Sequence, residues 1–149
     1  MKKFIYPLQS VLNLKEKLES QEKVLFQAAM EELRKEQEAL AQLEQRKDGY
    51  EKRLRDSVCS RLDLLSVKTN KEAIEVLKEM IRQQTGRVRH AERHAEVARK
   101  RLEEAIKERK TLEKLKEDAF AEYRKEYERE EQKEIDELVS FRHKAETTG

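Results

Sequence analysis

Histidine and cysteine are the residues of this chain whose types and spacing could support chemistry. His90 and His94 are four residues apart, a spacing that would place both imidazoles on one face of a helix, where they could bind a metal ion. Arg89 and Arg93 are their neighbours, and no third ligand is apparent in the sequence. Cys59 is the only cysteine, and a lone cysteine near a turn is usually inert. We therefore expect neither a metal site nor a reactive thiol.

Other catalytic signatures are missing from the sequence as well. The chain has no glycine-rich phosphate loop, no nucleophile elbow and no pair of carboxylates confined to a pocket. A pair of long helices also offers no cavity in which a reaction could exclude water. We predict that the protein is not an enzyme and holds no cofactor.

Composition points to a narrow apolar seam and not to a thick core. Charged residues make up 44% of the 149 residues and aromatic residues only 5%, with one Pro and no Trp. The 34 basic and 32 acidic side chains nearly cancel, so the one-sided basic field of a nucleic-acid-binding protein is missing. Locally the charge is uneven, because basic residues prevail by roughly two to one at residues 82–110 and acidic residues prevail at residues 113–137.

Apolar residues recur at spacings of three and four in two long stretches of the chain. Such spacing places apolar side chains along one face of a helix and is typical of a coiled coil. We predict an all-α fold of two long helices, at residues 7–58 and 70–142. The heptad positions of the second helix that should face the first are Ile74, Leu77, Ile81, Gln84, Val88, Ala91, Ala95, Ala98, Leu102, Ala105, Leu112 and Ala119.

Local signals predict where these helices begin and end. Pro7 suits the first turn of a helix, because its missing N–H would have no partner there. Thr69 and Glu72 fit a capping box at the start of the second helix. Residues 59–69 would then form the connection, and residues 146–149 would be a disordered tail.

Two long helices joined by a short connection should pair within the chain, because the connection keeps them at high effective concentration. We therefore predict one domain over residues 1–149, an antiparallel coiled-coil hairpin in which Tyr50 lies near Met80. The second helix is the longer one. Residues 123–143 would thus remain a single helix unless a partner covers them.

Four apolar residues gather at the connection of the hairpin: Leu62, Leu64, Leu65 and Val67. Exposed together, they would form a contact surface for another protein. They could equally form a helical turn that closes the end of the hairpin. The sequence leaves these two interpretations open.

The two ends of the chain carry a family resemblance. Phe4 and Leu8 precede a Val-Leu-x-Leu-Lys-Glu run at residues 11–16, a hairpin break follows near the middle, and the stretch at residues 130–137 is acidic. With these features the chain resembles the flagellar export protein FliJ family over most of its length. The resemblance implies a stalk that binds the hexameric ring of the flagellar export ATPase and links it to the membrane export gate. It also implies escort of substrate chaperones.

The resemblance further implies gate contacts at apolar and aromatic positions of both helices. By position these are Leu43, Tyr50 and Leu77, together with Met80 where the family has a small residue. Gln84 stands where the family has a histidine. Tyr50 and Leu77 are also seam positions, so their alternative role is to hold the hairpin together.

Other functions are compatible with the same pattern. The chain could be a self-associating structural coiled coil, a spacer or scaffold without an ATPase partner, or it could hold unfolded substrates through its tip leucines. No signal peptide or apolar stretch long enough to cross a membrane is present. We therefore expect a cytoplasmic protein that reaches the membrane periphery only through partners.

Overall fold

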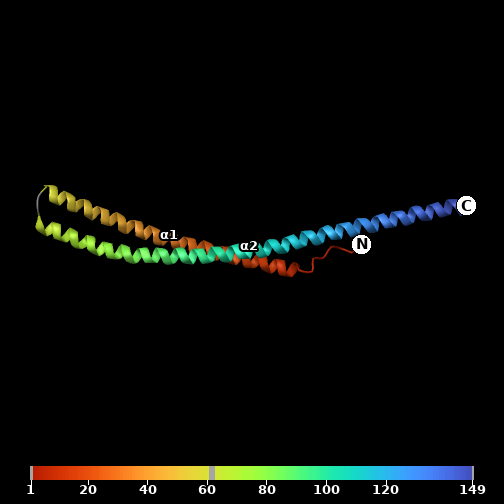
Figure 1. Ribbon diagram of the computed structural model, residues 1–149, viewed down its shortest axis with the longest axis horizontal. Helices are drawn as coiled ribbons and strands as arrows, with labels where there is room; N and C mark the ends of the chain where they lie inside the picture. Colours follow the sequence, from red (N-terminus) through yellow and green to blue (C-terminus); the bar gives the residue numbers. More distant parts are fainter. Residues whose placement is uncertain (1, 61–62, 149) are drawn as a thin grey trace. The chain divides into compact units, whose positions relative to one another are not determined.

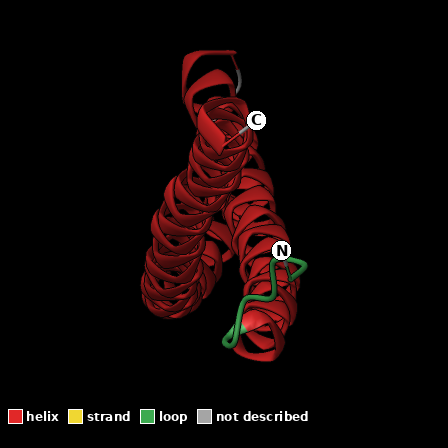
Figure 2. Ribbon diagram, turned by 90° about the vertical axis from the view of Figure 1, so that its right-hand side faces the viewer, coloured by secondary structure: helices red, strands yellow, loops and turns green. Residues whose placement is uncertain are grey.

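The computed structural model describes residues 2–60 and 63–148 of the chain. Two helices account for nearly all of them: α1 at Gln9–Ser60 and α2 at Leu64–Thr148 (Figure 1). Apart from a short loop at the N-terminus, which Figure 2 shows, and Asp63 before α2, the described residues are helical. The two long helices pack against each other as an antiparallel pair, which confirms the predicted all-α hairpin.

Helix α1 begins two positions after Pro7. Pro7 and Leu8 form a turn in which the N–H of Gln9 donates to the carbonyl of Tyr6 at 3.1 Å, and the N–H of Leu12 then donates to the carbonyl of Leu8 at 2.9 Å. The predicted start at residue 7 is thus slightly early. The reason is that Tyr6 is buried and fixes the entry of the chain before the helix begins.

Helix α2 begins earlier than predicted. Asp63 caps it, because its Oδ1 accepts from the N–H of Leu65 at 3.2 Å and its carbonyl accepts from the N–H of Val67 at 3.0 Å. Asp is at least as good an N-cap as Thr. Thr69 lies inside the helix and donates its hydroxyl to the carbonyl of Leu65 at 2.9 Å. The capping box at residue 69 is therefore wrong, and the connection is much shorter than residues 59–69.

The far end of α2 continues past the predicted end at residue 142. Helix persists to Thr148, into the segment expected to be disordered. The hydroxyls of Thr147 and Thr148 donate to carbonyls of the last turn, at 3.0 Å to His143 and 2.7 Å to Lys144. Such side-chain hydrogen bonds give a hydroxyl donor to backbone carbonyls of the last turn.

The contacts group the chain into two units, residues 21–103 and residues 1–20 with 104–149. In the first unit, a cluster of Ala29, Ala95 and Ala98 packs with Phe26 and Leu33. No large side chain among the described residues is fully buried, as expected for a seam open on both sides. Asn70 of α2 is buried in this unit without having been predicted. The other buried residues of α2 in this unit occupy predicted heptad positions: Ile74, Leu77, Gln84, Val88, Ala91, Ala95 and Ala98.

The register of this first unit differs from the predicted one by about a heptad. The hydroxyls of Ser57 and Ser66 are 3.5 Å apart, and Gln84 Nε2 donates to the carbonyl of Glu36 at 2.9 Å. The predicted register, with Tyr50 beside Met80, would have put Glu36 well away from Gln84. The early start of α2 explains the difference, because a shorter connection brings each residue of α1 level with an earlier residue of α2.

The second unit joins the N-terminal segment and the start of α1 to the later part of α2. Tyr6 is buried and donates its hydroxyl to the carbonyl of Leu112 at 3.1 Å. Charged pairs flank this contact: Lys15 lies 2.9 Å from Glu108, and Arg109 binds both Glu19 and Glu113. These carboxylates raise the pKa of Arg109, mainly through the Glu113 hydrogen bond, so the guanidinium stays charged.

Candidate partner-binding surfaces

The four residues predicted to face an export gate differ in their exposure. Leu77 is only 3% exposed and lies in the seam, whereas Met80 is 41% exposed. Leu43 and Tyr50 are half-buried. Met80 is thus the most accessible of the set, and Leu77 can act on a partner only through the packing of the hairpin.

Tyr50 takes part in a polar environment on α1. The guanidinium of Arg53 lies over its ring, 5.1 Å from the centroid, in a cation–π contact. Both residues line a shallow groove of about 470 Å³ together with Gly49 and Arg46. A partner at this position would meet an aromatic face and two guanidinium groups.

The start of α2 exposes apolar side chains beside the connection. Leu64 and Leu65 are each 73% exposed, and Val58 at the end of α1 is 55% exposed. Val67 is half-buried. Leu62 lies outside the described residues. Leu64 and Leu65 therefore match the interpretation of an exposed contact surface, whereas Val67 is partly covered.

The C-terminal part of α2 is the largest exposed helical surface in the described chain. Every residue from 124 to 148 is exposed. Ile135, Leu138, Val139 and Phe141 are 52–73% exposed, and their spacing places them along one side of the helix. Among the described residues nothing covers this apolar stripe.

An aromatic cluster precedes this stripe in the same unit. The ring of Phe4 lies 5.2 Å from that of Phe120 and 5.3 Å from that of Tyr123, and the Tyr123 hydroxyl donates to the carbonyl of Lys2 at 2.9 Å. The negative charge of Glu131, with a hydrogen bond to it, raises the pKa of Tyr127, whose ring lies 6.3 Å from Tyr123.

This aromatic attachment of the N-terminal segment was not predicted. The spacing of three and four residues among Phe120, Tyr123 and Tyr127 is the signal that was available for it. The same segment borders a groove of about 810 Å³ between residues 2–5 and α2. Ile5 in this segment is 77% exposed, so the N-terminal segment adds an apolar side chain to the accessible surface of the unit.

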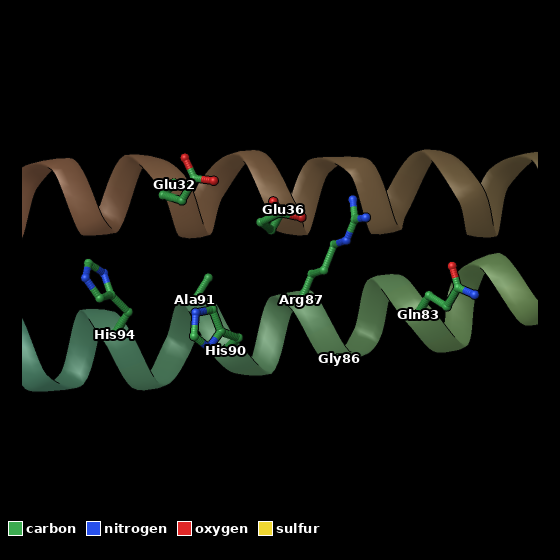
Figure 3. Close-up of a pocket in the computed structure, with 8 residues that line it drawn as sticks. All are labelled: Glu32, Glu36, Gln83, Gly86, Arg87, His90, Ala91 and His94. Atoms are coloured by element: carbon green, nitrogen blue, oxygen red, sulfur yellow. The ribbon is translucent and has the colours of Figure 1, made fainter.

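The two histidines line a groove of about 520 Å³ between α1 and α2 (Figure 3). The only carboxylates in its lining are those of Glu32 and Glu36, and Figure 3 shows the Glu32 carboxylate directed away from α2. Within residues 2–60 and 63–148, no three His, Cys, Asp or Glu side chains are arranged to hold a metal ion. Cys59 is exposed and has a free thiol.

Neither described helix contains a stretch apolar enough to cross a lipid bilayer. In a comparison with protein families, the chain matches the flagellar FliJ protein family over residues 3–148. Comparisons with curated proteins and with solved structures found no match. The family match covers nearly the whole chain, including both helices and the aromatic N-terminal segment. The chain therefore belongs to the flagellar FliJ protein family, whose members are components of flagellar protein export.

Proposed function

We propose that this protein is a stalk that binds the hexameric export ATPase through its unit of chain ends and the membrane export gate through its hairpin unit. The observation that carries the proposal is the exposed stripe of Ile135, Leu138, Val139 and Phe141 in a chain of this family. An uncovered apolar stripe on a charged helix favours association with another protein. On this proposal the chain performs no catalysis itself and acts at the cytoplasmic side of the membrane through its partners.

Local charge supports two different contacts. The exposed stripe belongs to a largely acidic region, whereas α2 between residues 82 and 110 is basic. An ATPase ring and a gate would then each meet a surface of different charge, which favours specificity more than affinity. Escort of substrate chaperones would use the hairpin unit as well.

The ATPase contact is tested by removing the stripe. The variant Ile135→Ser, Leu138→Ser and Phe141→Ser should lose stimulation of purified export ATPase. A control variant with Arg129→Ser, Lys133→Ser and Lys144→Ser has the same number of substitutions on the opposite side of the same helix. This control should keep the stimulation of the ATPase. Circular dichroism checks that both variants remain helical. Equal stimulation by both variants would remove the stripe from the contact.

The gate contact is tested at Met80, the most exposed of the gate-side residues. Met80→Ser should weaken binding to the cytoplasmic domain of the gate protein, measured by calorimetry, without lowering the thermal stability of the hairpin. Lys78, 49% exposed and two residues before Met80, lies on another side of the same helix and provides the control Lys78→Ser. A pair of variants that bind the gate domain equally would count against this surface.

A second candidate function follows from the tip. Leu64 and Leu65 are exposed enough to hold an apolar segment of a substrate or chaperone. Replacing both by Ser should abolish binding of an export chaperone and leave ATPase stimulation intact. The control is Lys68→Ser with Lys71→Ser, which removes charge and keeps both leucines. Chaperone binding by the leucine variant at the level of the wild type would exclude the tip.

A further inference from the structure

One side of the hairpin unit carries a continuous groove. A first section, of about 520 Å³, and a second section, of about 250 Å³, share Glu32 and His94 in their linings. On α2 the groove extends from Gln83 to Arg101, which corresponds to about 27 Å of helix. Its length is that of several helical turns, so it suits a helical partner better than a small ligand.

The two rims of the groove carry opposite charge. Helix α1 contributes the carboxylates of Glu22, Glu32 and Glu36, whereas α2 contributes the cations Arg87 and Arg101, with the imidazoles of His90 and His94 between them. In Figure 3, Arg87 extends from α2 toward α1 in the direction of Glu36. The groove is therefore acidic along one helix and basic along the other.

The rim charges are mostly unpaired, unlike those elsewhere on the same helices. Arg34 pairs with Glu31 and Glu38, and Arg99 pairs with Glu96 and Glu103. In the described part of the chain, by contrast, Glu22, Glu32, Arg87 and Arg101 form no ion pair. One carboxylate oxygen of Glu22 is buried without any hydrogen-bond partner, although a buried acceptor is normally satisfied.

The floor of the groove is built from small residues with two larger ones beside them. Gly86, Ala91 and Ala98 form part of it, while Leu25 and Val97 are 53% and 49% exposed. A floor of small side chains lets another backbone approach closely, and exposed Leu and Val supply knobs for the opposing surface. The groove is thus prepared for a second layer of helices.

We propose that this groove is where a second copy of the chain packs, groove against groove, to form an antiparallel four-helix bundle. This inference goes beyond the stalk proposed above and does not depend on it. A two-fold axis parallel to the helices places α1 of each copy over α2 of the other, at the same level along the groove. The acidic rim of each chain then meets the basic rim of its partner, as an isologous interface requires.

The levels of the charged residues agree with this arrangement. The hydrogen bond between Glu36 and Gln84 sets Glu36 level with the turn before Arg87. Glu22 and Arg101 share the lining of the other section, as do Glu32 and His94. Because residues at one level in the hairpin meet at the same level across the axis, Glu22 meets Arg101 and Glu36 meets Arg87, while Glu32 meets the imidazole of His94, which can donate a hydrogen bond.

Charge reversal tests the interface. One variant carries Glu22→Lys and Glu32→Lys, so that both of its rims are basic, and the other carries Arg87→Glu and Arg101→Glu, so that both are acidic. Each alone faces like charges across the axis in a homodimer, whereas a mixture faces opposite charges in a heterodimer. A control with Lys23→Glu and Lys100→Glu has the same charge change as the second variant but lies outside the groove.

Sedimentation across a dilution series at low salt measures the association, and circular dichroism verifies helicity. We expect the wild type and the control to dimerise with rising concentration. Each groove variant alone should self-associate at least about tenfold more weakly than the wild type. An equimolar mixture of the two groove variants should regain the dimer fraction of the wild type. A wild type that stays monomeric throughout would overturn the proposal. Groove variants that dimerise like the wild type, or a mixture that stays monomeric, would also overturn it.

Discussion

Leu77 provides the sharpest test of how this hairpin is held together. It is 3% exposed in the seam, whereas its neighbour Val76 on the same helix is 60% exposed. Replacing a buried Leu by Ala costs about 2–5 kcal/mol in a closed core. The seam is open on both sides and can relax into the space, so we expect Leu77→Ala to lower the free energy of unfolding by about 2–3 kcal/mol.

Urea unfolding followed by circular dichroism measures this free energy. The matched control is Val76→Ala, which removes exposed methyl groups and should change it by less than about 0.5 kcal/mol. A cost for Leu77→Ala no greater than that of Val76→Ala would refute the packing argument. Leu77→Met separates stability from binding, because a volume-conserving change should cost less than about 1.5 kcal/mol. If Leu77 acts through packing, that variant should bind the gate domain normally.

Three further predictions concern other contacts of the hairpin. Tyr6→Phe removes the hydrogen bond to Leu112 and should cost about 1 kcal/mol in chemical unfolding, and an unchanged value would show that the bond contributes nothing. Gln84→Leu should raise the melting temperature, because a buried leucine contributes about 1.5–3 kcal/mol and the lost hydrogen bond to Glu36 contributes only about 1 kcal/mol; a lower melting temperature would count against this view. The hydrogen bond from Arg34 lowers the pKa of Glu31. The ion pair therefore stabilises the helix fully at pH values above the pKa of Glu31 in the unfolded chain. This stabilisation is lost as the pH falls through the pKa of Glu31 in the folded chain. The difference in melting temperature between wild type and Glu31→Gln should therefore vanish in acid, and a difference that persists there would exclude this pair as its cause.

Boundaries were the least predictable part of the fold. Asp63 and Thr69 are both acceptable N-caps, and the sequence pattern favoured Thr69 because Glu72 completes a capping box. Asp63 caps the helix in the structure, and the longer α2 buries Asn70 and Ile74 against α1. Tertiary packing thus selected between two local signals of similar strength.

The accessible surfaces also depended on register. Leu77 is a predicted heptad position and is buried, whereas Met80 lies outside the predicted heptad positions and is exposed. The register, by contrast, decided which residues of α1 lie beside each of them. The groove has the same origin, since its acidic and basic rims come from residues far apart in the sequence, and no local pattern indicates that they lie side by side.

Periodicity and composition alone determined that this chain forms two long helices with a narrow seam, because apolar spacing reports directly which side of a helix must be covered. The family resemblance was readable at the same level. The tertiary structure alone decided the register, the anchoring of the N-terminal segment by Tyr6 and Phe4, and the unpaired charges along the groove. These depend on contacts between distant residues, where the length of one short connection shifts every pairing that follows it.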